Sequence, residues 1–240
     1  MANLAPNKSG GETMPENIIT QTVNFRANGN TADGYLARPD SPGPHPAVIV
    51  IQEWWGVDAH IKDVTERFAR LGFAAIAPDL YHGQVTAEPD EAKKLLMELE
   101  YETAAKEIDG AAAWLSSQAF VSSPKFGCVG YCMGGGLVLT TAIRNHNVAG
   151  AIVYYGGLPT PADSLSGIEA PVLAFYGDGE ADTANELGRV LNEHNKDVEV
   201  HIYEGAAHGF FNDSNEGGYD LAAAYDTWPR AVHFLKSNLV

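Results

Sequence analysis

Residues 125–136 read KFGCVGYCMGGG, and they decide the fold because they join a buried strand to a helix through a very tight turn. The apolar run KFGCV is typical of a strand, and residues 134–145 are typical of a helix. Between them, Gly130 and Gly134 flank Cys132 with the spacing G-x-C-x-G. A Cβ atom on either glycine would collide with the neighbouring strand or helix. The pattern predicts that Cys132 lies at the tip of a sharp strand-to-helix turn.

Strand and helix patterns alternate on both sides of this turn. Residues 46–52, PAVIVIQ, form a continuous apolar run of the kind that is buried on both faces of a parallel sheet. We expect an antiparallel opening pair at 19–25 and 34–38, further strands at 73–77, 126–129, 150–155, 171–176 and 198–203, and helices at 59–71, 89–117, 134–145, 183–195 and 221–238. Such alternation predicts an α/β fold with a mostly parallel central sheet and helices on both faces, whose ligands bind at the carboxyl ends of the strands.

The composition limits the domain organisation and the partners. A chain of 240 residues with 45% hydrophobic and 19% charged residues is typical of one globular domain, which we place at 19–240 after a polar, flexible tail at 1–18. The net charge of −16 would repel nucleic acids and anionic membranes. No apolar run approaches the roughly 20 residues of a membrane span, and no signal-peptide pattern is present. We therefore expect a cytoplasmic monomer or small homo-oligomer that acts on small molecules.

Cys132 could be a small buried apolar residue, as we expect for Cys128 in mid-strand. The turn favours a nucleophile instead, because the following helix directs free N–H groups and a positive dipole end toward the sulfur. The two cysteines lie on different elements, so no disulfide is expected between them.

A nucleophilic cysteine requires a base and an orienting acid, which follow it in the chain order nucleophile, acid, histidine. His208 lies in the loop EGAAHGFFND after a predicted strand, and we predict it as the base. The segment GDGEAD at 177–182 offers three acids; the spacing Gly-x-x-Asp favours Asp182, with Asp178 as the alternative. Asp182 could instead cap the next helix. Because the histidines do not cluster at ligand spacing, we expect no metal and no cofactor.

Glu53 ends the strand PAVIVIQ and is followed by Trp54 and Trp55. It could be a solvated strand-end acid, but a carboxylate near a thiol could also take or hold its proton. The backbone N–H groups of Trp54 and Met133 would then converge as an oxyanion hole. Aromatic residues at these strand ends are candidates for the substrate pocket, although such residues are as often part of the core: Trp55, Tyr81, Tyr154 and Phe210.

Four segments together resemble the dienelactone hydrolase family of the α/β-hydrolase superfamily. They are VIVIQEWWGVDAHIKDVTERFARLGFAAIAPDLYHG at 48–83, KFGCVGYCMGGG at 125–136, AIVYYGG at 151–157 and EGAAHGFF at 204–211, and they occur in the order of the family. The resemblance covers about residues 19–238. It implies an α/β-hydrolase fold and a Cys-Asp-His triad, with these roles: Cys132 as nucleophile, His208 as base, Asp182 as orienting acid, Glu53 as partner of the resting thiol, and Trp54 and Met133 as oxyanion donors.

Two features depart from the family pattern. Members that act on dienelactone are expected to hold the substrate carboxylate with arginines, one of them four residues after the catalytic histidine. This chain has Asn212 at that position, so we include Asn212 among the substrate-binding candidates and expect a less anionic or larger substrate. The acid loop is also longer than usual, which keeps Asp178 as an alternative.

These residues predict an enzyme that hydrolyses esters or lactones through a thioester acyl-enzyme. A thiolate is itself a good leaving group, so we expect enol or aryl esters to react better than amides. Two alternatives remain. The chain could be a carboxylesterase or thioesterase acting on a substrate unrelated to dienelactone, or a non-catalytic binding protein in which Cys132 senses oxidants.

Overall fold

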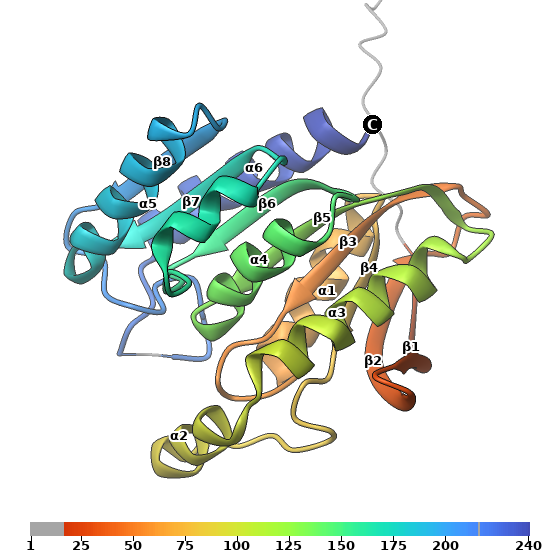
Figure 1. The fold of residues 1–240 in the computed structure, drawn as a ribbon. Helices are drawn as coiled ribbons and strands as arrows, with labels where there is room; N and C mark the ends of the chain where they lie inside the picture. The colour runs from red at the N-terminus through yellow and green to blue at the C-terminus, as the bar shows by residue number, and fades with distance from the viewer. Residues whose placement is uncertain (1–16, 216) are drawn as a thin grey trace, which may run out of the picture.

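The computed structural model describes residues 17–215 and 217–240 (Figure 1). The flexible tail expected at 1–18 therefore lies almost wholly outside the described residues, and Ile18 already belongs to the first strand. No helix in the described ranges is long and apolar enough to cross a membrane.

One sheet of eight strands forms the centre of the molecule, in the order β1-β2-β4-β3-β5-β6-β7-β8. Strands β1 and β2 pair antiparallel, as does β2 with β4, and the remaining pairs are parallel. The strands are β1 Ile18–Ala27, β2 Asn30–Pro39, β3 His45–Ile51, β4 Ala74–Pro78, β5 Val121–Tyr131, β6 Val148–Tyr154, β7 Val172–Gly177 and β8 Val198–Tyr203. The prediction of a mostly parallel α/β sheet with an antiparallel opening pair is confirmed.

Helices cover both faces of this sheet (Figure 1). The α-helices are α1 Ala59–Arg70, α2 Pro89–Glu98, α3 Tyr101–Ser116, α4 Met133–Arg144, α5 Ala181–Glu193 and α6 Leu221–Leu239, and the 3-10 helices are η1 Ala162–Gly167 and η2 Asp178–Glu180. Helices α3, α4 and α5 pack on one face, while α1 and α6 pack on the other. The five residues 47–51 of β3 are fully buried between these layers, as their apolar sequence predicted.

The helical segment predicted at 89–117 is two helices rather than one. Leu99 and Glu100 have extended backbone angles, which end α2 and allow α3 to begin in a new direction at Tyr101. The break has a consequence for the site, because it brings Tyr101 to the carboxyl edge of the sheet beside α4. The composition of this region, rich in alanine and leucine, gave no signal for the break.

Candidate active site

Cys132 is the residue between β5 and α4, and its backbone has a positive φ of 55°. Its N–H donates to the carbonyl of Tyr154 on the neighbouring strand at 3.0 Å, which holds the turn in place. An ideal Cβ on Gly130 would lie 2.2 Å from the Gly134 carbonyl oxygen, and one on Gly134 would lie 2.5 Å from the carbonyl oxygens of Ile51 and Gln52. The predicted steric need for both glycines is confirmed.

The two cysteines have different surroundings, and both are free. Cys128 is fully buried within β5, where burial raises the pKa of its thiol. Cys132 is partly exposed and lines a cavity. Cys132 is thus the thiol that a reagent or substrate can reach.

His208 follows β8 and faces the sulfur of Cys132. A hydrogen bond with Cys132 raises the pKa of His208 to about 10, a second one with Glu180 adds to this effect, and burial opposes it. The imidazole also lies 5.0 Å from the Tyr155 ring, between centroids. With its pKa raised in this way, His208 favours the protonated form, in which it can donate to the Cys132 sulfur.

Glu180 is the carboxylate that contacts this histidine, through a hydrogen bond between its Oε1 and His208 Nδ1. Its other oxygen accepts the N–H of Gly177 at 3.2 Å, so the side chain is held from two sides. Only 19% of the Glu180 side chain is exposed. An acid in this place fixes the tautomer of the histidine and stabilises its charged form.

The carboxylate bonded to His208 is therefore Glu180 and not Asp182, the acid that the sequence pattern favoured. Asp182 is exposed in the first turn of α5, and Asp178, the alternative, accepts the N–H of Gly205 at 2.7 Å. The reason is that two glycines, Gly177 and Gly179, each precede an acid by three residues. The spacing Gly-x-x-acid fits Gly177 to Glu180, and Gly177 is the glycine that packs on the histidine loop, because a Cβ there would lie 2.4 Å from the Ala206 carbonyl oxygen.

Glu53 lies just beyond the end of β3 and is only 3% exposed. Its Oε2 accepts a hydrogen bond from the Asn212 amide, and its Oε1 accepts one from the Tyr155 hydroxyl at 3.3 Å. Burial raises the pKa of Glu53 to about 7, although the hydrogen bond from Asn212 opposes the rise. Glu53 is thus a buried group that titrates near neutral pH, and not a solvated acid at the end of a strand.

A cavity of about 380 Å³ opens beside Cys132 and His208. The other residues that line it come from α3, α4 and the loop after β6: Tyr101, Met133, Gly136, Thr140, Tyr155, Gly157, Leu158, Pro159 and Thr160. Within the described part of the chain, no lysine or arginine lines this cavity. Its wall is apolar with a few hydroxyl groups, and His208 is its one basic side chain.

None of the five residues predicted to bind substrate lines this cavity. Tyr154 and Phe210 are fully buried in the core, and Asn212 is 3% exposed and bonded to Glu53. Trp55 and Tyr81 line two neighbouring cavities, and the Tyr81 hydroxyl contacts Met133 Sδ at 3.5 Å.

Tyr155, directly after β6, does line the cavity. Its backbone has a positive φ of 41°, outside the range of the strand before it. Tyr155 could not be predicted because the sequence presents Tyr154 and Tyr155 together as one strand end. Tyr101, Thr140 and Leu158 could not be predicted because loop paths and helix breaks decide which of them lie beside Cys132.

No group of three or more His, Cys, Asp or Glu side chains in the described ranges is arranged to hold a metal ion.

Comparison with known proteins places the chain among hydrolases. Residues 32–239 match the model of the Dienelactone hydrolase family. "Protein usf" of Aquifex pyrophilus is 33% identical over 91% of this chain and 99% of its own length. The "Putative carboxymethylenebutenolidase" of Aquifex aeolicus is 31% identical over 91% of this chain and 99% of its own length. A crystal structure from Klebsiella pneumoniae, described as a "Putative Dienelactone Hydrolase", is 28% identical with a TM-score of 0.84, covering 92% of this chain and 99% of that one.

Proposed function

Since the chain belongs to the dienelactone hydrolase family, we propose that it hydrolyses esters or lactones with Cys132 as a covalent nucleophile. The observation that carries the proposal is the line of contacts from Cys132 through His208 to Glu180 at the wall of the 380 Å³ cavity. This is the arrangement of nucleophile, base and orienting acid that acyl transfer requires. Glu180 takes the place that the sequence pattern gave to Asp182.

In the first step, the thiolate of Cys132 attacks the carbonyl carbon, and the carbonyl oxygen gains a negative charge. Met133 is the first residue of α4, so its N–H has no acceptor within the helix and is part of the positive end of the helix dipole. We assign this N–H, together with that of Trp54 after β3, to the oxyanion hole. Removal of one such donor typically costs about 100-fold in rate.

In the second step, the carbon–oxygen bond to the alcohol breaks and the alkoxide takes the proton of His208, which leaves an acyl group on the sulfur. Water then attacks this thioester while His208 accepts a proton, and the carboxylic acid and thiolate are released. Glu180 holds the imidazole in the tautomer that both steps need.

Glu53 is proposed as the acid that tunes the resting thiol. No direct contact with Cys132 is needed for this role, because Tyr155 donates to Glu53 and also lines the cavity that holds the sulfur. A negative charge on Glu53 disfavours the thiolate, whereas a proton on Glu53 favours it. With a pKa of about 7, Glu53 changes its protonation state near neutral pH.

We propose uncharged enol or aryl esters and lactones as the substrate class. Relatives carry the name carboxymethylenebutenolidase, which describes an enzyme for a lactone that bears a carboxylate. The described wall of this cavity offers such a carboxylate no lysine or arginine. Its apolar side, Leu158 and Pro159, and its hydroxyls, Tyr101 and Thr140, suit a neutral acyl group.

A panel of activated esters and lactones tests the proposal on the wild type, Cys132→Ser and Cys132→Ala. We expect turnover by the wild type, an acyl adduct on the peptide that contains Cys132 in quenched samples, and no turnover by Cys132→Ala. Turnover by the alanine variant would remove Cys132 as the nucleophile. Alkylation of Cys132 by iodoacetamide, combined with no turnover of any ester, would support the thiol sensor instead.

A further inference from the structure

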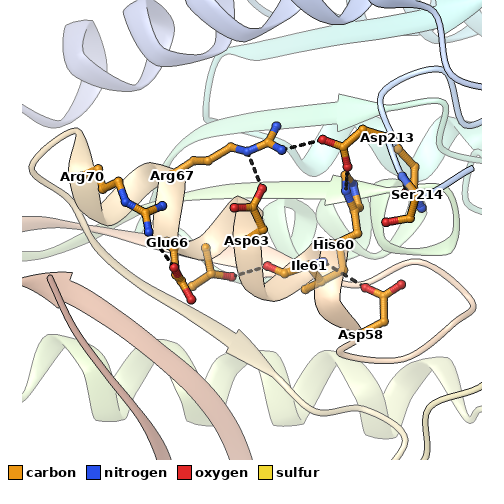
Figure 2. Close-up of polar contacts among 11 residues, drawn as sticks. Asp58, His60, Ile61, Asp63, Glu66, Arg67, Arg70, Asp213 and Ser214 are labelled. Carbon is orange, nitrogen blue, oxygen red and sulfur yellow. Dashed lines mark hydrogen bonds and ion pairs between the residues drawn. The ribbon is translucent and has the colours of Figure 1, made fainter.

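Asp213, in the loop that also carries His208, joins this loop to α1 through its carboxylate (Figure 2). Asp213 Oδ2 accepts a hydrogen bond from Arg67 Nη2 at 2.6 Å, and Asp213 Oδ1 lies 3.2 Å from His60 Nδ1. Both partners belong to α1, about 150 residues earlier in the chain. Arg67 is held in turn by Asp63, one helical turn away, at 2.5 Å. The contact is therefore a long-range clamp on the catalytic loop.

The histidine of this clamp is a buried, neutral donor. The His60 side chain is 0% exposed and packs edge-on against the rings of Tyr131 and Phe211, with centroids 6.1 Å away in each case. Burial lowers the pKa of His60, and its Nε2 has no hydrogen-bond partner among the described residues. A charged ring would leave that N–H buried and unpaired. We therefore assign the proton to Nδ1, which donates to Asp213.

Asp213 remains a carboxylate in this setting. Burial acts to raise its pKa, but the hydrogen bond and charge of Arg67 outweigh it and hold the pKa of Asp213 below its usual range. Two donors thus face two carboxylate oxygens, and each oxygen has its own partner. This geometry fixes both the position and the orientation of the Asp213 side chain.

Asn212 lies directly before Asp213 and contacts the active site. Its Oδ1 accepts the N–H of Ser214 at 2.9 Å, so its Nδ2 is turned toward Glu53 Oε2. On one side Asn212 follows Phe210 and Phe211, which are buried in the core. On the other side it precedes Asp213, the clamped residue. The orientation of the Asn212 amide thus depends on the buried Phe210 and Phe211 before it and on Asp213 after it.

We propose that Asp213, held by His60 and Arg67, is a positioning residue that keeps the Asn212 amide on Glu53 and so sets the protonation of Glu53. This inference rests on the proposed function only where it concerns catalysis. The effect of Asp213 on Glu53 can be measured whether or not the protein turns over a substrate. The other groups that face Glu53 are Tyr155 after β6, Asp58 before α1, and His208. None of these is bonded to Asp213.

A ¹³C NMR titration of protein labelled at the glutamate carboxyl groups tests the proposal directly. The resonance of Glu53 is identified by its absence in Glu53→Gln. In Asp213→Asn we expect its midpoint to rise by about one pH unit, the effect of losing one hydrogen bond to a carboxylate. The direction is diagnostic, because removal of a nearby negative charge would by itself lower the pKa of Glu53.

Two further variants keep the test decisive. Arg67→Gln removes the more exposed of the two partners of Asp213, so it tests the proposal even if Asp213→Asn fails to fold. In this variant we expect the Glu53 midpoint to rise by less than in Asp213→Asn. Asp63→Asn is the matched control: it removes the other carboxylate of Arg67 without touching the loop, and the Glu53 midpoint should not move. An unchanged or lowered midpoint in folded Asp213→Asn or in Arg67→Gln would overturn the clamp, as would equal rises in Asp63→Asn.

Ester hydrolysis is measured on the same samples with p-nitrophenyl acetate. We expect the pH profile of kcat/KM to move with the Glu53 midpoint in Asp213→Asn. If the wild type hydrolyses no ester while the NMR midpoint still rises, the proposed function fails and the clamp stands. If the wild type is active and the midpoint does not rise, the clamp fails and the function stands.

Discussion

Glu180 and Asp182 stand two residues apart, yet of the two it is Glu180 that bonds to His208. We expect Glu180→Gln to lower kcat/KM for an activated ester by about 100-fold or more, because the histidine loses its charged partner and its fixed tautomer. Asp182→Asn is the matched control, and it should retain wild-type activity because its side chain is exposed. Steady-state kinetics of the two variants decide the assignment. A larger loss of kcat/KM in Asp182→Asn than in Glu180→Gln would support Asp182 as the orienting acid, as the sequence pattern favoured.

Glu53 should make the stability of the protein depend on pH. Its pKa is about 7 in the folded state and about 4.5 without the fold, because burial disfavours the charged form. As pH rises from 4.5 to 7, the unfolded chain releases this proton first, so the free energy of unfolding falls. The loss amounts to about 3 kcal/mol and stops above pH 7.

Glu53→Gln removes this titration, which gives the test. We expect the free energy of unfolding of the wild type, relative to that of Glu53→Gln, to fall between pH 5 and pH 8. Urea denaturation at the two pH values measures the difference. If both proteins change by the same amount, Glu53 is ionised in the folded state throughout this range.

The turn between β5 and α4 is the element on which the site depends. In Gly134→Ala the new Cβ would meet two backbone carbonyl oxygens at 2.5 Å, and backbone cannot move aside as a flexible side chain can. We expect a loss of about 2 kcal/mol or more in stability, within the range of overpacked or strained positions, together with loss of activity.

Gly188→Ala in the interior of α5 is the control for this element. Its Cβ would meet only a side-chain methyl at 3.6 Å, so the higher helix propensity of alanine should stabilise the protein by about 0.5–1 kcal/mol. Thermal unfolding compares the two variants. Equal stability of Gly134→Ala and the wild type would show that the turn relaxes around a side chain.

The elements also show which parts of the site the sequence could predict. Cys132, His208 and Glu53 were found because each ends or follows an apolar strand, and the carboxyl ends of parallel strands share one edge. Glu180 was missed because two glycines, Gly177 and Gly179, offer the same spacing, and only three-dimensional packing chooses between them. Cavity residues such as Tyr101 depend on where a helix breaks, for which the local sequence carried no signal.

For the whole molecule, the net charge of −16 acts together with a cavity whose described lining includes no lysine or arginine. Both features should disfavour an anionic substrate: the net charge repels it at long range, and the described wall offers its charge no lysine or arginine at contact. We expect kcat/KM to be higher for a neutral aryl ester than for an ester of equal size that carries a carboxylate. Added salt should narrow the gap, because it screens the long-range part.

Two variants separate the long-range effect of the net charge from the effect of a charge at the cavity wall. Thr160→Lys places a cation at the cavity wall, whereas Thr22→Lys adds the same charge on β1, at the far edge of the sheet. We expect Thr160→Lys to raise kcat/KM for the anionic ester several-fold at high salt, where Thr22→Lys has no effect, because a contact charge survives screening that removes a distant one. A wild type that prefers the anionic ester at low salt would mean that its carboxylate binds outside this cavity, and the neutral substrate class would be wrong.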